Sequence, residues 1–246
     1  MNNTIILIPS RLAATRLPKK PLLKINNFSI INHVYQKAKS TGIGDAYVAT
    51  GDQEIFQEVK QNGGNCVLTE KEHKTGTDRI FEAYQKLNLN DVEYVINLQG
   101  DEPIIDIQDI QNLYNKTIKK KSEISTLACK IKNRQLFSKS NIVKVITEQE
   151  LSTKNVSKAK AFTRNVLENN YKNTYHHIGI YMYKVSILEK FVNLKQTKNE
   201  ISHKLEQLRA MENNIEIDVN LANSSPIGVD THEDYMEIKK LMEYKN

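Results

Sequence analysis

The pattern of hydrophobic and polar positions changes period repeatedly along the first half of the chain. Short apolar runs have the length of buried strands, whereas apolar residues three or four positions apart form one face of a helix. The runs predict strands over 5–8, 46–50, 66–69 and 92–98. The helical spacing predicts helices over 30–38, 55–59, 80–87 and 107–118. Strands and helices in alternation are typical of an α/β fold with a parallel sheet and right-handed crossovers.

The second half of the chain breaks this alternation. Two strands are predicted over 124–131 and 142–147 without a helical pattern between them, and the polar stretch 151–175 is expected to be a long loop. The alternating strand predicted over 215–221 should have one exposed face. The other predicted elements are a strand over 178–183 and helices over 185–192, 205–211 and after Thr231. Thr231 is expected to cap the last helix, which turns four residues inward: Tyr235, Ile238, Leu241 and Met242.

Length and charge narrow the functional classes. The 246 residues fit one domain over 1–246, and the net charge of +6 comes from scattered lysines whose longest run is Lys119–Lys121. The sequence lacks Trp and the aromatic and basic signatures of nucleic-acid binding, so we predict no nucleic-acid partner. Cys66 and Cys129 have no metal or redox spacing. No apolar run has the length of a membrane span and no leader pattern is present, so we predict no membrane insertion and expect a cytoplasmic location.

A cation-rich loop follows the first predicted strand. Pro9 ends the apolar run, and from Ser10 onward small residues are mixed with cations: Arg11, Arg16, Lys19 and Lys20. Because ligands of open α/β sheets bind beyond the carboxyl ends of strands, and arginine forks match phosphate oxygens, this loop predicts a polyanion site. A solvated basic loop is the alternative. The motifs GxxxxGK[ST] and GxGxxG are absent from the sequence, so neither a Walker-type ATPase nor a dinucleotide-binding Rossmann protein is supported.

Two acids stand where a magnesium ion would need ligands. Asp101 follows the strand predicted over 92–98, and Asp230 lies between a short apolar segment and the last helix. Mg²⁺ is usually held by one or two carboxylates together with phosphate oxygens. Capping of a turn by Asp101 and of a helix by Asp230 are the alternatives, so the metal interpretation depends on the two acids coming together.

His73, Arg79 and His177 indicate a functional site less clearly than the two acids do. His73 and Arg79 belong to a turn that precedes a helix, a position that holds anions or base edges, although a capped helix start explains it as well. His177 precedes a strand, where a single histidine is more often structural than catalytic. No Ser-His-Asp or Cys-His set follows from the spacing, so covalent catalysis has no support.

Taken in order, several blocks of the sequence resemble one known family. The blocks are IPSRLAATRLPKKPL, HKTGTDR, NLQGDEP, HIGIYMY, LEQLRAME and GVDTHED, and they extend from Ile8 to Asp234. They resemble the CMP-Kdo synthetases, which are 3-deoxy-manno-octulosonate cytidylyltransferases. The opening loop and GDEP are shared widely among nucleotidyltransferases, whereas the last three blocks are particular to the Kdo branch.

The resemblance implies a fold and a reaction. The fold would be the nucleotide-diphospho-sugar transferase α/β/α sandwich, with a mostly parallel sheet and a smaller lobe, approximately within 124–222, that helps to form a homodimer. CTP and 3-deoxy-D-manno-octulosonate (Kdo) would be converted to CMP-Kdo and diphosphate with Mg²⁺, as a step of lipopolysaccharide biosynthesis.

The resemblance also implies roles for individual residues. Asp101 and Asp230 would ligate the metal, and with Arg11 and Lys20 they would be the catalytic residues. The binding residues fall into three groups: Ser10, Arg11, Arg16 and Lys20 for the triphosphate; Thr50, Arg79 and Gln99 for the cytidine side; and Arg164, His177, Tyr181, Glu206 and Gln207 for the sugar acid.

The sequence departs from the family pattern at a few positions. Lys19 stands where glycine is usual, which would cost on the order of 1 kcal/mol if the backbone angle φ is positive there. Ala14 replaces a common serine, and Arg164 is followed by Asn165-Val166-Leu167 in place of the usual continuation. Two other functions stay open: a nucleotidyltransferase for another acidic sugar, such as 8-amino-Kdo or a sialic acid, and a non-catalytic nucleotide-binding module.

Overall fold

The structure is a computed structural model that describes residues 3–13, 16–166, 171–225 and 227–243. Ala14 and Leu167, two of the departures noted above, therefore lie outside the described residues. The chain divides into two compact units, which are described separately. Unit 1 comprises Met1–Gln108 and Pro226–Asn246, and unit 2 comprises Asp109–Ser225. Because the end of the chain returns to unit 1, residues from both termini contribute to it.

Unit 1 is built on a parallel sheet, as the alternating pattern predicts. Its strands lie in the order β5-β4-β1-β6, and every pair is parallel. Their bounds are β1 Thr4–Ser10, β4 Ala46–Thr50, β5 Cys66–Leu68 and β6 Tyr94–Asn97. The register pairs Ser10 with Thr50, so the strands end along one edge. This carboxyl edge is where open α/β sheets place their ligands.

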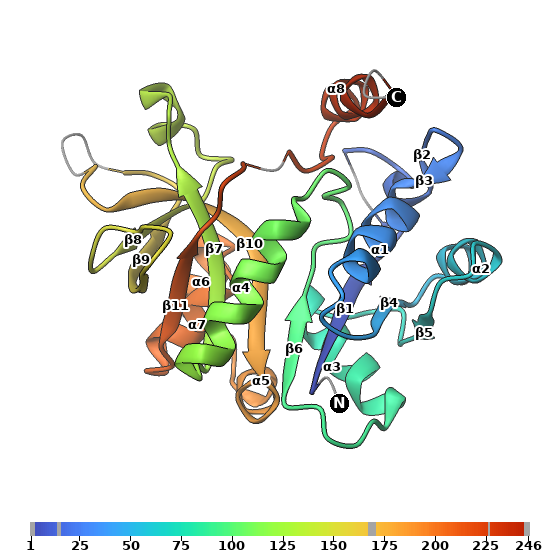
Figure 1. Cartoon of the computed structure of the whole chain (residues 1–246), viewed down its shortest axis with the longest axis horizontal. Helices are drawn as coiled ribbons and strands as arrows, with labels where there is room; N and C mark the ends of the chain where they lie inside the picture. Colours follow the sequence, from blue (N-terminus) through green and yellow to red (C-terminus); the bar gives the residue numbers. More distant parts are fainter. Residues whose placement is uncertain (1–2, 14–15, 167–170, 226, 244–246) are drawn as a thin grey trace. The chain divides into compact units, whose positions relative to one another are not determined.

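Helices cover both faces of this sheet, as Figure 1 shows. They are α1 Ile30–Ser40, α2 Gln53–Gln61 and α3 Gly76–Leu87. The chain moves outward from β1 through β4 to β5 and then crosses back to β6. Right-handed crossovers therefore put α1 and α2 on one face and α3 on the other. Thr75 caps α3 through a reciprocal capping box with Asp78, which ends the preceding loop at a defined residue.

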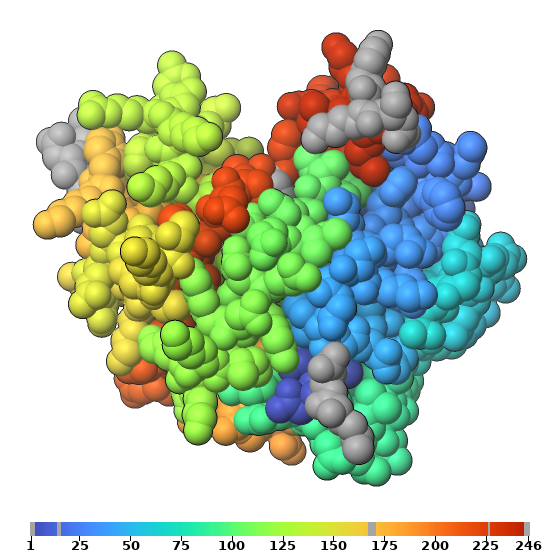
Figure 2. All heavy atoms as spheres, viewed as in Figure 1, coloured from blue at the N-terminus to red at the C-terminus, as the bar shows by residue number. Residues whose placement is uncertain are grey.

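The C-terminal helix α8, His232–Glu243, packs on the region that follows the basic loop. This region comprises the 3₁₀ helix Lys20–Leu22 and a short hairpin, β2 Lys24–Ile25 and β3 Phe28–Ser29. In Figure 2 the red surface of α8 adjoins the blue surface of the N-terminal segment. The shared core contains five buried residues: Leu17, Ile25, Ile30, Val229 and Ile238. This packing holds the last helix beside the basic loop, although the two are far apart in the sequence.

Two predictions for α8 have different outcomes. The Thr231 cap is confirmed, because the Asp234 amide donates to Thr231 Oγ1 at 3.2 Å. The prediction that Leu241 faces inward is wrong, since its side chain is 41% exposed. Only Ile238 of the four predicted residues is fully buried, and Tyr235 and Met242 pack at the edge of the cluster. The helix is amphipathic over a narrower stripe than the sequence indicates.

Unit 2 contains a mixed sheet in the order β10-β7-β11-β9-β8. Only β7 and β11 are parallel among the pairs of the described residues in this unit, and β8 also pairs with the start of β10. The strands are β7 Ile124–Lys130, β8 Lys144–Thr147, β9 Val156–Thr163, β10 Thr174–Lys184 and β11 Ile217–Leu221. The helices are α4 Ile107–Lys120, α5 Val185–Asn193, α6 Lys198–His203 and α7 Gln207–Glu212. The first of them begins within unit 1, and a 3₁₀ turn covers Arg134–Phe137. The α/β fold class is confirmed, and the expected break in the alternation falls in this unit.

The prediction of a long loop over 151–175 is wrong. All of β9 and the start of β10 lie within this stretch, although 167–170 are outside the described residues. The strand β9 buries only Ser157 and Phe162, so its apolar alternation is weak. Two hydrogen-bonded neighbours stabilise it as a strand: β8, which directly precedes it, and β11, which lies far along the sequence. The helix α6 is also absent from the prediction, because the one residue that it buries is the polar Glu200 and it therefore has no apolar periodicity.

The prediction of an exposed face on 215–221 is also wrong. The four residues Ile217–Asn220 are all buried, including the polar Asp218. One carboxylate oxygen of Asp218 accepts from Lys120 Nζ at 2.5 Å and the other from Ser122 Oγ at 2.5 Å. These bonds satisfy a buried carboxylate, so a polar residue on the strand does not indicate a solvent-exposed face.

Over the described ranges, no helix combines the length and the apolar character that a membrane crossing requires.

Candidate active site

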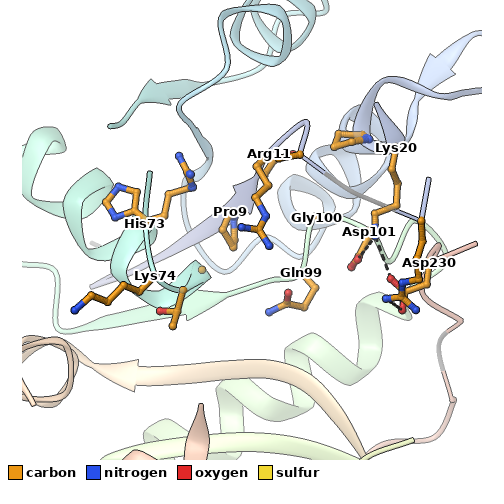
Figure 3. A pocket seen from close by; sticks show the side chains of 16 residues that line it. Pro9, Arg11, Lys20, His73, Lys74, Gln99, Gly100, Asp101 and Asp230 are labelled. Carbon is orange, nitrogen blue, oxygen red and sulfur yellow. Dashed lines mark hydrogen bonds and ion pairs between the residues drawn. The ribbon is translucent and has the colours of Figure 1, made fainter. Parts of the chain in front are cut away.

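A pocket of about 450 Å³ lies at the carboxyl edge of the unit 1 sheet (Figure 3). Every residue that lines it belongs to unit 1. Its volume is in the range of small-molecule sites. The wall is formed by four groups: Pro9, Ser10, Arg11, Ala13, Arg16, Lys20 and Pro21 after β1; His73, Lys74, Thr75, Gly76 and Arg79 before and within α3; Gln99, Gly100 and Asp101 after β6; and Asp230 before α8.

The basic loop is fixed near its start by a contact from the neighbouring strand. Asp52, just after β4, accepts a hydrogen bond from the Leu12 amide at 2.7 Å. Ser10 is buried at the end of β1, and Arg11 next to it is exposed in the pocket. The loop is anchored again where Leu17 enters the apolar cluster under α8. These anchors keep the cations at the mouth of the sheet edge.

The structure brings Asp101 and Asp230 together, as the metal-ligand prediction requires. The Lys20 ammonium lies 2.7 Å from Asp101 Oδ2 and 3.3 Å from Asp230 Oδ1. Arg16 Nη2 lies 3.1 Å from the other oxygen of Asp230. The Val229 amide donates to the Asp101 carbonyl at 2.9 Å, which joins the two acid-bearing segments. Two carboxylates that are far apart in the sequence therefore face one point in the pocket (Figure 3).

This pair of acids fits a divalent cation that is also bound by a substrate. The Asp101 and Asp230 oxygens are both within hydrogen-bonding distance of one nitrogen atom, so a small cation near that position can contact both. Among the described residues no cluster of three or more His, Cys, Asp or Glu side chains could hold a metal. Further ligands would therefore come from phosphate oxygens and water, which is the usual arrangement for Mg²⁺.

Gly100 explains why the acid-bearing turn reaches this point. A Cβ atom on Gly100 would lie 2.8 Å from the Pro9 carbonyl oxygen and 3.3 Å from Ile31 Cδ1. The turn after β6 thus passes directly against the end of β1, which only a residue without a side chain allows. Gln99 and Asp101, on either side of Gly100, consequently line the same pocket as Arg11.

The other end of the pocket is formed by the segment before α3. In Figure 3 His73 and Lys74 lie at the opposite end from Asp101 and Asp230, with Arg11 and Gln99 between them. Arg79 lines this end although it is only 4% exposed. Burial lowers the pKa of its guanidinium, but arginine stays charged at such sites.

Thr50 is the one predicted residue of the cytidine group that does not line the pocket. Its side chain is fully buried at the end of β4, and its Oγ1 accepts from the Asp52 amide at 3.1 Å. It therefore supports the turn that carries Asp52.

The predicted sugar-acid residues all lie in unit 2. His177 and Tyr181 on β10 form part of a row of rings, with centroids 5.4 Å apart, and Phe162 lies 5.1 Å from His177 on the other side. Burial, and then the neighbouring His176, lower the pKa of His177 to about 3, so the ring is neutral at pH 7. Its Nε2 lies 3.1 Å from the Thr126 hydroxyl.

The other three members of this group have different environments. Gln207 is buried at the start of α7, and Glu206 next to it is half-buried, with Oε1 3.9 Å from Arg209 Nη2. Arg164 donates to three backbone carbonyls, those of Ser140, His203 and Lys204, at 3.0–3.2 Å. These contacts tie Arg164 to the end of α6.

Two residues that shape the unit 1 site are missing from the sequence prediction. Asp52 positions the basic loop, and its place directly after a predicted strand is a signal that could have identified it. Glu82 on α3 bonds both His73 and the Glu70 amide. Its position on a helix surface carries no local signal, because its partners are known only once the loop is placed.

Comparison with known proteins identifies the family. A family model described as cytidylyltransferase matches residues 5–217. A 3-deoxy-manno-octulosonate cytidylyltransferase of Thermodesulfovibrio yellowstonii is 40% identical over an alignment of 251 positions. The alignment covers 97% of this chain and 98% of the relative. One of Rhodopseudomonas palustris is 42% identical over 232 residues, covering 94% of each chain.

Solved structures agree with these relatives. A CMP:2-keto-3-deoxy-manno-octonic acid synthetase complexed with CTP superposes with a TM-score of 0.89 at 32% identity, covering 99% of each chain. A UDP-glucose pyrophosphorylase complexed with UDP-glucose, at 16% identity and a TM-score of 0.70, shares the fold alone. By sequence along nearly its whole length and by structure, the chain belongs to the 3-deoxy-manno-octulosonate cytidylyltransferase family.

Proposed function

We propose that the protein transfers the cytidylyl group of CTP to Kdo, giving CMP-Kdo and diphosphate for lipopolysaccharide biosynthesis. The observation that carries the proposal is the convergence of Asp101 and Asp230 on the Lys20 ammonium, inside a pocket rimmed by arginines. Family membership supplies the substrate class, since relatives similar over nearly the whole chain carry the name of this enzyme.

The reaction requires alignment and charge neutralisation more than covalent help. The anomeric 2-hydroxyl oxygen of Kdo forms a bond to the α-phosphorus of CTP, the bond from that phosphorus to the bridging oxygen of diphosphate breaks, and the hydroxyl proton is released. Such in-line displacements are accelerated by groups that hold the phosphates and neutralise developing charge. We assign this role to Ser10, Arg11, Arg16 and Lys20, which line the pocket around the two acids.

Asp101 and Asp230 are proposed to hold Mg²⁺ together with the triphosphate. Bound Mg²⁺ would supply neutralisation of phosphate charge and a lower pKa for the attacking hydroxyl. Lys20, only 13% exposed, lies between the two carboxylates and keeps them close despite their like charge. Arg11, which lines the same pocket, would then meet the diphosphate leaving group.

The remaining residues are assigned to the two organic parts of the substrates. Arg79 and Gln99 line the pocket and are proposed for the cytidine side, together with the buried Thr50, which would act through the turn that carries Asp52. The unit 2 residues are proposed for Kdo: Arg164, His177, Tyr181, Glu206 and Gln207. Arg164 suits the Kdo carboxylate chemically, because its planar fork binds carboxylates bidentately, and binding would exchange some of its bonds to the Ser140, His203 and Lys204 carbonyls for bonds to the substrate. A homodimer and a cytoplasmic location stay predictions.

The test measures diphosphate release from CTP and Mg²⁺ with and without Kdo. We expect Kdo-dependent release, and we expect Asp101→Asn, which is nearly isosteric, to lose it by on the order of 10²–10³-fold or more. Asp91→Asn is the matched control, since exposed Asp91 loses the same charge and its positive φ of 65° suits asparagine.

Folded wild-type protein that releases no diphosphate with Kdo would overturn the proposal. Competition by 8-amino-Kdo or a sialic acid would show whether another acidic sugar is preferred. Binding of CTP without turnover of any sugar acid would indicate a nucleotide-binding module instead.

A further inference from the structure

The segment Thr69–Thr75, which we call the wall segment, joins β5 to α3 and supplies His73, Lys74 and Thr75 to the pocket. It is neither helix nor strand before Gly76. The peptide groups of such a segment need partners other than the regular ladders. How the wall segment is held therefore decides how well this end of the pocket is formed.

Two side chains of α3, one turn apart, hold the wall segment by its backbone. Arg79 donates through Nη1 to Thr69 Oγ1 at 2.6 Å and to the Glu70 carbonyl at 3.0 Å, and through Nη2 to the Lys71 carbonyl at 3.0 Å. Glu82 accepts from the Glu70 amide with both carboxylate oxygens, at 3.0 and 3.1 Å. The peptide groups around Glu70 are thus bonded to α3 through both a carbonyl and an amide.

The same carboxylate also holds a side chain of the pocket wall. Glu82 Oε2 lies 2.6 Å from His73 Nε2, and Glu82 Oε1 lies 2.6 Å from Lys86 Nζ. The His73 side chain is only 14% exposed, although it lines the pocket. Hydrogen bonds to an ionised carboxylate are about twice as strong as neutral ones. Glu82 therefore fixes His73 without lining the pocket itself.

The far side of the wall segment has no room for displacement. A Cβ atom on Gly51, at the end of β4, would lie 2.5 Å from Lys71 Cα and 2.6 Å from the Glu70 carbonyl oxygen. The wall segment is therefore enclosed between the end of β4 and α3. If its bonds to Arg79 and Glu82 are weakened, the wall segment cannot move toward β4, so its displacement changes the shape of the pocket.

We infer that Glu82 is a positioning residue for the nucleoside end of the CTP site, acting through the wall segment and His73. The inference rests on the proposed function, since it assumes that the phosphates lie at the Asp101–Asp230 end. His73 and Lys74 lie at the opposite end of the pocket in Figure 3, so they face the nucleoside. Glu82 then affects how tightly CTP binds, while the metal and the sugar acid are bound by other residues.

The experiment is direct CTP binding by calorimetry with Mg²⁺ and without Kdo, combined with steady-state kinetics. Glu82→Gln keeps the shape and removes the charge, and we expect a CTP Kd raised about tenfold, as loss of charge-assisted bonds implies. The kcat and the KM for Kdo should stay within about twofold, a split that general destabilisation would not produce. Hydrogen exchange of the wall segment should rise in the same variant.

Two control variants separate positioning from charge and from helix stability. Glu72→Gln removes an equal charge from an exposed residue of the wall segment. Lys86→Gln removes the third partner of Glu82, which also donates to the Leu68 carbonyl at 3.0 Å, and leaves Glu82 in place. Both should bind CTP within about twofold of wild type. The inference is overturned if Glu82→Gln binds CTP like wild type, or if Lys86→Gln weakens binding equally. Wild-type protein that fails to bind CTP would instead overturn the proposed function.

Discussion

At the scale of single residues, Lys19 shows a local cost at the edge of the site. Its backbone is left-handed, with φ 53° and ψ 23°, where it precedes the 3₁₀ helix Lys20–Leu22. A side chain in this conformation costs on the order of 1 kcal/mol relative to glycine. The Lys19 ammonium is 2.9 Å from Glu54 Oε2, but both side chains are more than half exposed, so the ion pair stabilises the fold little. The positive φ suspected from the family pattern is confirmed.

Lys19→Gly should therefore increase the free energy of unfolding by about 1 kcal/mol, because glycine adopts this conformation without strain. Urea unfolding at neutral pH measures it. Lys19→Ala is the matched control, since it removes the same ion pair and keeps the Cβ atom, and it should not stabilise the protein. Equal stabilities of the two variants would show that the backbone conformation carries no cost.

At the scale of elements, the site depends on how closely strand ends approach one another. The turn after β6 touches the end of β1 at Gly100, and α3 begins against Pro9, 3.4 Å from where a Cβ atom on Gly76 would lie. The turn after β4 holds the basic loop through Asp52. Each contact is between backbone and a neighbouring element, so these elements place the polar side chains more precisely than the loops alone would.

Gly100→Ala should destabilise unit 1 by about 1–3 kcal/mol, because the added methyl group would meet the Pro9 carbonyl at 2.8 Å in a closely packed region. It should also lower turnover, since Asp101 and Gln99 would move with the turn. Gly228→Ala serves as control: the nearest atom to its new Cβ would be Glu102 Cγ at 4.0 Å. Thermal unfolding and diphosphate release measure both variants, and an unaffected Gly100→Ala would mean that the turn can shift freely.

At the scale of the whole molecule, buried ionisable groups connect stability to pH. In unit 2 burial lowers the pKa of His177 to about 3 and also lowers that of His176. A histidine whose folded pKa lies below its unfolded value of about 6.5 binds its proton in the unfolded state first. The contribution of such a histidine to the free energy of unfolding is therefore complete above pH 6.5 and is lost as the pH falls toward its pKa in the folded protein. Burial alone would raise the pKa of Glu200, but hydrogen bonds, mainly from Arg209, lower it overall. The stability that Glu200 contributes is therefore lost only at a more acidic pH.

The contribution of His177 to the free energy of unfolding should accordingly fall between pH 6.5 and pH 5, with a slope of at most about 1.4 kcal/mol per pH unit. Glu102 acts in the opposite direction, because burial raises its pKa to about 8 and its contribution is lost as the pH rises. The measurable quantity is therefore the difference between wild type and a His177 variant. His177→Gln removes the titrating ring, so the wild-type minus variant difference in unfolding free energy should shrink as the pH falls from 6.5 to 5, while the contributions of Glu102 and His176 stay in both proteins. Urea unfolding across the range measures both proteins. An unchanged slope in His177→Gln would show that this ring does not bind its proton on unfolding in that interval.

Local patterns in the sequence were sufficient for much of unit 1. The strand over Ala46–Thr50 has the predicted bounds, and the cap at Thr231 is where the side-chain chemistry indicates. These features depend on residues within a few positions of one another. In unit 2 the pairing of β9 with β11 and the burial of Asp218 depend on partners far along the chain, so the local pattern gives the wrong answer for both.

The sequence by itself determined the α/β alternation, the cation-rich loop after the first strand and the two acids that end apolar segments, because each is a property of neighbouring residues. Only the tertiary structure decided that Asp101 and Asp230 meet at Lys20, that Arg79 is engaged by backbone carbonyls, and that Glu82 holds the wall of the pocket. These contacts join segments that are adjacent only after the sheet has formed. Their geometry depends on chain packing across the sheet edge, which no local period of apolar and polar residues encodes.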